Sequence, residues 1–219
     1  MTSTTDRIAI LLNGPKYCGK DTAASALLEV FGPESAIFRF TVPVKEETHR
    51  RYGLSVPYDH FEGKDVKDAP LPEFGGLSPR EAYIKVGDEL RAEHGPDIVT
   101  RMLCGRIRES DLPIVINPDC GGDAEAEGIA AELGADRVIV LRIHKDGHDY
   151  RGDSRNWVVS PGLRKIDIVN VDGKVVDYLA TVREIGLMFR DSVLGPAAGA
   201  RELHAEARFL LRDRPKRFG

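Results

Sequence analysis

The sequence predicts an α/β domain in which a parallel sheet is flanked by helices, and three observations support this prediction. Short apolar runs bounded by turn residues alternate with helical patterns along the chain, which is typical of βαβ units. The first apolar run, at 8–12, leads through a glycine-containing turn into a helical pattern at 19–31. The 219 residues are 42% hydrophobic and 30% charged, a composition that suits one folded globular domain.

Later elements follow from the same patterns. Further strands are expected at 36–40, 114–117, 138–143 and 166–171. Helices are expected from near Pro43, from Ser78, after Pro96, at 124–133 and at 176–189. Ser78 begins the run S-P-R-E, in which serine caps the helix, proline takes its first position and glutamate completes a capping box.

The remaining segments have little periodicity. Residues 52–76 are rich in proline, glycine and charge, and we interpret them as a long functional loop. Residues 144–161 form a second polar loop. We expect residues 1–190 to form one domain and residues 191–219 to form a C-terminal helical appendage with a basic end.

Composition restricts the class of protein. The net charge of −4 argues against a dedicated nucleic-acid binder, which carries an excess of Lys and Arg. The three cysteines form no C-x-x-C pair, so neither a disulfide framework nor a zinc site is expected. We find no secretory signal and no run long enough for a membrane span, and we therefore expect a cytoplasmic protein without a membrane partner. The oligomeric state stays open, with a homodimer among the options.

The most specific motif is G-P-K-Y-C-G-K-D-T, which runs from Gly14 to Thr22 and has the spacing G-x-x-x-x-G-K. It lies between an expected strand and an expected helix, as a phosphate-binding P-loop does. Gly14 and Gly19 allow the backbone to curl around a phosphate, with Lys16 between them, and the helix dipole attracts negative charge. We therefore expect Lys20 to reach the terminal phosphates of a nucleoside triphosphate and to act in catalysis.

One position departs from the general motif. Where Ser or Thr usually places a hydroxyl on Mg²⁺, this chain has Asp21 followed by Thr22. A carboxylate beside a triphosphate is repelled unless a cation lies between them, so Asp21 or Thr22 is expected to help hold Mg²⁺. The alternative is that Asp21 is a first-turn residue that interacts favourably with the helix dipole.

With this variant motif in view, the chain resembles the phage deoxynucleoside monophosphate kinases along most of its length, up to about Phe189. Further similar segments are Val42–Lys45, Arg80–Asp88, Asn117–Asp119 with Asp123 and Glu125, and Ile168–Gly173. The resemblance implies a P-loop fold of three α/β/α layers with a five-stranded parallel sheet, an acceptor region at about 41–110 and a lid at about 144–161. It also implies ATP and Mg²⁺ as cofactors and a small nucleotide as the acceptor.

The resemblance also suggests which residues contact the acceptor. They are Val44, Lys45, Arg80, Gly87, Asp88 and Asp119. Lys45 and Arg80 are expected to bind the acceptor's phosphate. Asp119 lies just past a strand, where ligands bind in α/β sheets, and is expected to hold Mg²⁺ through water or to bind the acceptor; the alternative is a cap for the next helix.

Cations for the transferred phosphate are expected on the second polar loop. Arg142 ends the fourth strand, and Arg151 and Arg155 lie on the lid, where arginine's planar fork suits phosphate oxygens. A closing lid would bring them over the phosphates. The alternative is that these arginines are solvated loop charges.

The expected function is transfer of the γ-phosphate of ATP to a deoxynucleoside monophosphate. The family has an arginine where this chain reads Cys120-Gly121-Gly122, which motivates a second hypothesis: a kinase for a hydroxymethylated pyrimidine in DNA. Only that hypothesis makes DNA a partner. A non-catalytic nucleotide-binding module, and a kinase of a small metabolite such as a sugar or phosphomevalonate, are further alternatives.

Overall fold

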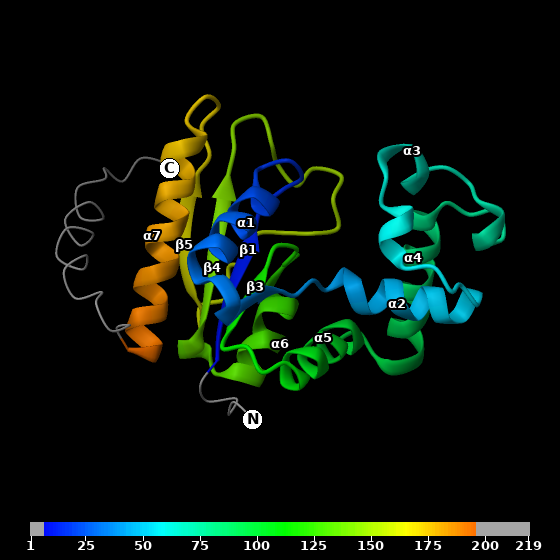
Figure 1. Ribbon diagram of the computed structural model, residues 1–219, viewed down its shortest axis with the longest axis horizontal. Coiled ribbons are helices and arrows are strands. Elements are labelled where there is room, and N and C mark those ends of the chain that lie inside the picture. The colour runs from blue at the N-terminus through cyan, green and yellow to red at the C-terminus, as the bar shows by residue number, and fades with distance from the viewer. Residues whose placement is uncertain (1–6, 196–219) are drawn as a thin grey trace.

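The computed structural model describes residues 7–195 and shows a three-layer α/β/α domain with a helical lobe beside it (Figure 1). The central sheet has five strands, all parallel, in the order β2-β3-β1-β4-β5. The strands are β1 (Ile8–Asn13), β2 (Ser35–Ile37), β3 (Ile114–Asn117), β4 (Val138–His144) and β5 (Arg164–Val169). Because β1 is central, its carboxyl end opens where ligands bind in such sheets.

Helices cover both faces of the sheet, since every residue of β1 is buried. One set of alternate β1 side chains packs with two helices that also contact each other, α1 and α7. The other set packs with α5 and α6. These helices are α1 (Lys20–Phe31), α5 (Ile98–Glu109), α6 (Asp123–Leu133) and α7 (Val175–Leu194). Burial on both faces explains why the central strands are continuous apolar runs in the sequence.

The helical lobe, residues 41–94, has a small core of its own. Its elements are α2 (Thr41–Tyr52), η3 (Tyr58–Phe61), α3 (Lys64–Lys67), η4 (Pro72–Phe74) and α4 (Pro79–His94). Phe61 and Phe74 are buried edge to face, with ring centroids 5.0 Å apart, and Tyr83 packs on them. The interpretation of residues 52–76 as a loop missed this core, because the aromatic residues are too widely spaced to give a periodic pattern.

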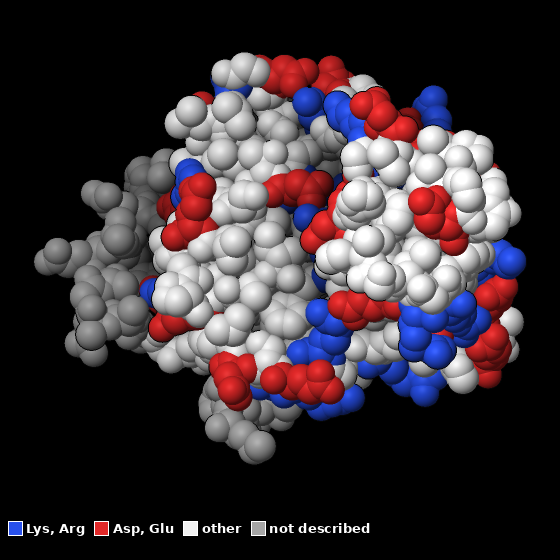
Figure 2. Space-filling model, turned by 45° about the vertical axis from the view of Figure 1, so that its right-hand side comes forward, with Lys and Arg blue, Asp and Glu red and all other residues white. Residues whose placement is uncertain are grey.

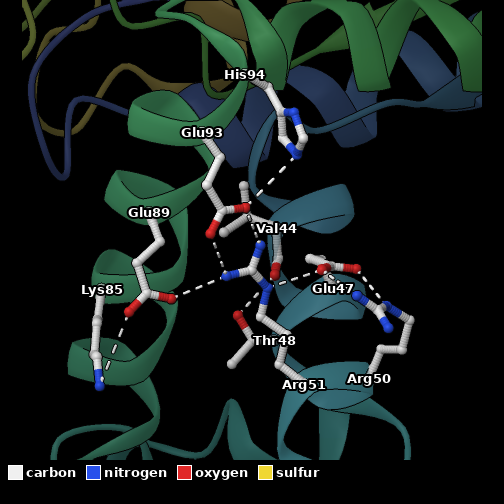
Figure 3. Close-up of polar contacts among 9 residues, drawn as sticks. All are labelled: Val44, Glu47, Thr48, Arg50, Arg51, Lys85, Glu89, Glu93 and His94. Carbon is white, nitrogen blue, oxygen red and sulfur yellow. Dashed lines mark hydrogen bonds and ion pairs between the residues drawn. The ribbon is translucent and has the colours of Figure 1, made fainter.

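Arg51 fixes the two long helices of the lobe to each other (Figure 3). Its guanidinium group donates to Glu47 on its own helix at 2.8 Å, and to Glu89 and Glu93 of α4 at 3.0 and 2.9 Å. Hydrogen bonds from Arg50, opposed by burial and assisted by Arg51, lower the pKa of Glu47 to about 2. One planar cation among three carboxylates forms a network that is stronger than an isolated exposed ion pair.

Most of the predicted elements are present, and their ends show where the predictions were wrong. The second strand stops at Ile37 rather than at residue 40, because the chain turns there into α2. The fifth strand begins at Arg164, two residues early, since an edge strand tolerates polar residues that face solvent. The helix from Ser78 has its capping box.

The C-terminal prediction falls partly outside the described residues. The last helix, α7, continues to Leu194, so the start of the predicted appendage at 191–219 belongs to it. Residues 196–219 lie outside the part of the chain that the structure describes. Among residues 7–195, no helix is long and apolar enough to cross a membrane.

Candidate phosphate-binding site and acceptor side

The loop between β1 and α1 has no room for side chains at its glycines. A Cβ on Gly14 would lie 2.6 Å from both Cys18 Sγ and the carbonyl oxygen of Ile143. At Gly19 the backbone has φ 103°, and a Cβ would lie 2.6 Å from Asn170 Nδ2. Glycine is required at both places, because the backbone itself packs closely and, at Gly19, adopts a left-handed conformation. A backbone-lined loop before a helix is the arrangement that binds phosphate.

Lys20 lies inside this loop. Its side chain is 9% exposed, and Nζ donates to the carbonyl oxygens of Gly14 and Pro15, both at 2.6 Å. Burial lowers the pKa of Lys20; the neighbouring Cys18 raises it and the charge of Arg155 lowers it. The ammonium group is therefore positioned to meet a phosphate held by the loop, and Arg155 lies close enough to influence it.

Two side chains from the far edge of the sheet hold the loop from outside. Asn170, just after β5, donates from Nδ2 to the carbonyl oxygen of Cys18 at 2.9 Å. The hydroxyl of Tyr178 on α7 donates to the carbonyl oxygen of Gly19 at 3.0 Å. Burial raises the pKa of Tyr178, which keeps it a neutral donor. No role was predicted for either residue, since each acts on a loop more than 150 residues away.

The residues predicted to hold a metal do not form a cluster. Asp21 and Thr22 are exposed at the start of α1, and Asp21 Oδ1 accepts from Arg39 at 2.7 Å. In the described part of the chain, no group of three His, Cys, Asp or Glu side chains could hold a metal ion. The metal role of Asp21, Thr22 and Asp119 remains a prediction, and Lys16 is an exposed residue of the loop.

Asp119 joins the sheet to the helical lobe. Its carboxylate accepts from the backbone N–H of Phe40 at 3.0 Å, from the N–H of Thr41 at 3.2 Å and from the Thr41 hydroxyl at 3.1 Å. Asn117 Nδ2 also donates to it at 3.0 Å. It therefore caps α2, although the alternative considered from the sequence was a cap for α6.

On the lobe, the two predicted cations contact carboxylates. Lys45 Nζ lies 2.7 Å from Glu62 Oε1 and 5.4 Å from the ring centroid of Tyr58, and its side chain is largely buried. Arg80 Nε donates to Asp68 at 2.5 Å and is about half exposed. An anionic ligand of Lys45 or Arg80 would therefore have to replace the carboxylate with which that side chain is paired.

The apolar predicted residues of the lobe pack close together. Val44 is buried, and a Cβ on Gly87 would lie 3.5 Å from Val44 Cγ1 and 3.4 Å from Arg91 Nη1. Asp88 accepts from Arg91 at 3.1 Å. Both distances are ordinary van der Waals contacts, so Gly87 lies at a close but unstrained contact of α4 with α2. Arg91 was missed from the sequence, where it reads as one more surface charge of an amphipathic helix.

The three predicted lid arginines differ in their surroundings. Arg151 is 93% exposed and pairs with Asp149 at 3.1 Å. Arg142 was expected to end the fourth strand, but β4 continues to His144, and Arg142 pairs with Asp167 of the neighbouring β5 at 2.5 Å. Arg155 is half-buried and pairs with Asp153. Hydrogen bonds from Arg155, opposed by burial, lower the pKa of Asp153 to about 2. In addition to burial, the charge of Arg155 lowers the pKa of Lys20.

A common pattern connects these cations: each pairs with a carboxylate. The pairs are Arg39–Asp21, Lys45–Glu62, Arg80–Asp68, Arg91–Asp88, Arg142–Asp167, Arg151–Asp149 and Arg155–Asp153. Figure 2 shows basic and acidic side chains along the furrow between the sheet domain and the helical lobe. Phosphate oxygens accept hydrogen bonds from the same donors as carboxylates do.

Glu125, which was named from the sequence only as part of a similar segment, is a half-buried acid with a defined partner. Glu125, in the first turn of α6, accepts from the backbone N–H of Gly121 at 2.6 Å. Burial raises its pKa to about 7; this hydrogen bond and the charges of Arg91 and Arg155 lower it, and Asp119 raises it. Glu125 thus supports the glycine turn after β3, where Gly121 also lies against the stem of Arg155.

The comparisons with known proteins agree with a kinase-like fold. No family model matches the chain. It is 25% identical over 154 residues to phosphomevalonate kinase from Drosophila melanogaster, over 70% of this chain and 75% of that protein. A gluconokinase structure from Sinorhizobium meliloti 1021 aligns over 91% of this chain and 98% of that chain at 12% identity, but the TM-score of 0.35 is too low to compare sites. The loop, the parallel sheet and the related kinase together give this chain a P-loop kinase-like fold.

Proposed function

We propose that this chain is an ATP-dependent kinase whose acceptor is a small molecule with a phosphate monoester, and that a deoxynucleoside monophosphate is that acceptor. The observation that carries the proposal is Lys20, which is buried in a glycine loop with its ammonium group on the carbonyls of Gly14 and Pro15. The helical lobe adds several cations that are paired with carboxylates. Phosphoryl transfer requires such cations and positioning rather than covalent chemistry by the protein.

On the donor side, the loop would bind the β- and γ-phosphates of ATP, with Lys20 moving its contacts from the carbonyls of Gly14 and Pro15 to phosphate oxygens. Arg155 would stabilise the charge that spreads over the transferred group. Mg²⁺, held between the phosphates and Asp21 or Thr22, would supply further neutralisation. The fit rests on the two glycines, which allow the loop backbone to curl tightly against Cys18, Ile143 and Asn170.

On the acceptor side, four cations would exchange their carboxylate partners for the acceptor's charge. Arg39, Lys45, Arg80 and Arg91 lie on the segment before α2 and on the two long helices of the lobe. Each now pairs with an acid. A phosphate group on the acceptor can replace the carboxylates as the partner of these cations, whereas an uncharged acceptor cannot. The cations therefore favour a phosphorylated acceptor.

The relative from Drosophila melanogaster supports a second candidate. Its name gives it phosphomevalonate, a small phosphorylated metabolite, and the similarity covers most of this chain. Both candidates share an anionic phosphate monoester as acceptor and differ in whether a base is present. The identity of the rest of the acceptor therefore separates them, and it requires a direct comparison.

The test is release of ADP from ATP and Mg²⁺ with each acceptor in turn, with the phosphorylated product identified by mass. The acceptors are deoxynucleoside monophosphates, ribonucleoside monophosphates, phosphomevalonate and hydroxymethylated DNA. Replacing Arg80 by glutamine is expected to raise KM for the acceptor about tenfold or more, since a charged hydrogen bond is lost. Lys85→Gln, exposed on the same helix, serves as the matched control.

Each outcome has a defined meaning. Turnover on deoxynucleoside monophosphates alone supports the first candidate, and turnover on phosphomevalonate alone supports the second. Activity on DNA alone moves the function to base modification. Tight ATP binding without turnover on any acceptor contradicts the proposal and indicates a nucleotide-binding module.

A further inference from the structure

A buried amide lies directly before the phosphate-binding loop. Asn13 ends β1 and is 0% exposed. Its Nδ2 donates to the carbonyl oxygens of Cys120 and Asn156 and to the hydroxyl of Tyr150, each at 3.0 Å. Its Oδ1 accepts from the backbone N–H of Val158 at 3.0 Å. One side chain thus connects β1, the turn after β3 and the lid segment, residues 144–161.

These contacts fix the stretch of lid that contains Arg155. The next residue, Asn156, bonds to Asn13 through its carbonyl and donates its N–H to the carbonyl oxygen of Gly121 at 2.8 Å. The stem of Arg155 lies against the same glycine, where an added Cβ would be 2.9 Å from Arg155 Cγ. The backbone next to Arg155 is therefore held by two hydrogen bonds, one to the Asn13 side chain and one to the carbonyl oxygen of Gly121.

We propose that Asn13 is a positioning residue, which holds the lid segment so that the Arg155 stem stays packed on Gly121, at the end of the sheet from which the phosphate-binding loop starts. The inference rests on the proposed function, because it gives Arg155 a part in phosphoryl transfer. An amide suits the place, because its two N–H groups face the carbonyl oxygens of Cys120 and Asn156, with the Tyr150 hydroxyl sharing a donor, while its oxygen accepts the N–H of Val158. An aspartate of the same shape would face the two carbonyl oxygens with a carboxylate.

The first test is a double-mutant cycle on kcat. Asn13→Ala is expected to lower kcat about 100-fold through misplacement of Arg155, with KM for ATP unchanged. Arg155→Ala is expected to lower kcat about 1,000-fold. If Asn13 acts through Arg155, the double variant matches Arg155→Ala within about twofold. Tyr150→Phe, which removes one bond of the set, gives a smaller loss in the same direction if Asn13→Ala folds poorly.

The second test needs no activity, so it separates failure of this inference from failure of the proposed function. Trp157 is the only tryptophan of the chain and lies in the lid segment. It packs edge to face on Tyr150, with ring centroids 5.1 Å apart. If Asn13 holds the lid segment, the Trp157 ring becomes more accessible in Asn13→Ala, and acrylamide quenches its fluorescence more strongly than in the wild type. Asn117→Ala, which removes a buried amide at the end of β3 that bonds to Phe38 and Asp119, should leave the quenching unchanged.

Two results overturn the inference. If the losses in kcat multiply in the double variant, Asn13 does not act through Arg155. If Trp157 is quenched equally in Asn13→Ala and in the wild type, Asn13 does not hold the lid segment. If the wild type transfers phosphate to no acceptor, the quenching result still decides whether Asn13 holds the lid.

Discussion

The cap that Asp119 provides for α2 predicts a large loss of stability in Asp119→Ala. The substitution removes the acceptor for two backbone N–H groups at the start of α2 and for the Thr41 hydroxyl. Loss of a helix cap costs about 1–2 kcal/mol. The amide of Asn117 also loses a partner, which adds about 1 kcal/mol. We therefore expect the free energy of unfolding to fall by about 2–3 kcal/mol.

The measurement is urea unfolding followed by circular dichroism at 222 nm. Asp119→Asn keeps one oxygen that can accept an N–H, so it should lose about half as much. Glu127→Ala, exposed on the nearby helix α6, should lie within about 0.5 kcal/mol of the wild type. If Asp119→Ala unfolds like the wild type, and only the Mg²⁺ dependence of activity changes, the residue is a metal ligand and the capping explanation is refuted.

Two further predictions concern the loop and Glu125. Gly14→Ala should abolish nucleotide binding measured by calorimetry, because the added Cβ would clash with Cys18 and Ile143. The control Gly162→Ala, whose Cβ would lie in open space, should bind the nucleotide like the wild type. Equal nucleotide affinity of the two variants would contradict the close packing at Gly14. The pKa of Glu125, raised by burial from 4.5 to about 7, means that the native state binds this proton more tightly than the unfolded state. The stabilisation that the protonated Glu125 contributes is therefore complete below about pH 4.5 and lost by about pH 7. Between these pH values the free energy of unfolding of Glu125→Gln should rise by about 2–3 kcal/mol relative to that of the wild type, as measured by urea unfolding. Equal pH dependence of the two free energies would contradict this prediction.

The parts of the fold that the sequence predicted are those with a local cause. The loop from Gly14 to Thr22 is defined by residue spacing, and the helix at Ser78 by a capping box within four residues. The central strands are continuous apolar runs because both of their faces are buried. The edge strand β5 gave a weaker signal, since polar residues there face solvent.

The rest depends on partners that are distant in the sequence. Asp119 was identified as a residue past a strand, but the helix that it caps begins 78 residues earlier. Asn13 contacts the lid across more than 130 residues, and it reads in the sequence as the polar end of a strand. Such pairs follow from the order of strands in the sheet, which spacing along the chain does not specify.

The site residues were predicted by type better than by environment. Lys20 is buried in its loop, as the motif indicates, whereas Arg151 is almost fully exposed and Arg155 is half-buried, although both lie on the same polar segment. The difference comes from Gly121, whose lack of a side chain leaves space for the stem of Arg155. No pattern within the lid itself distinguishes the two arginines.

The most direct test of the account is a comparison of the wild type with Lys20→Met, in which ADP formation and the free energy of unfolding are measured on the same preparations. The account predicts a loss in kcat of at least about 100-fold, since the charge that meets the transferred phosphate is gone. It also predicts unchanged or increased stability, because burial already disfavours the ammonium group that methionine replaces. Full activity in Lys20→Met would contradict the central claim that this loop catalyses phosphoryl transfer.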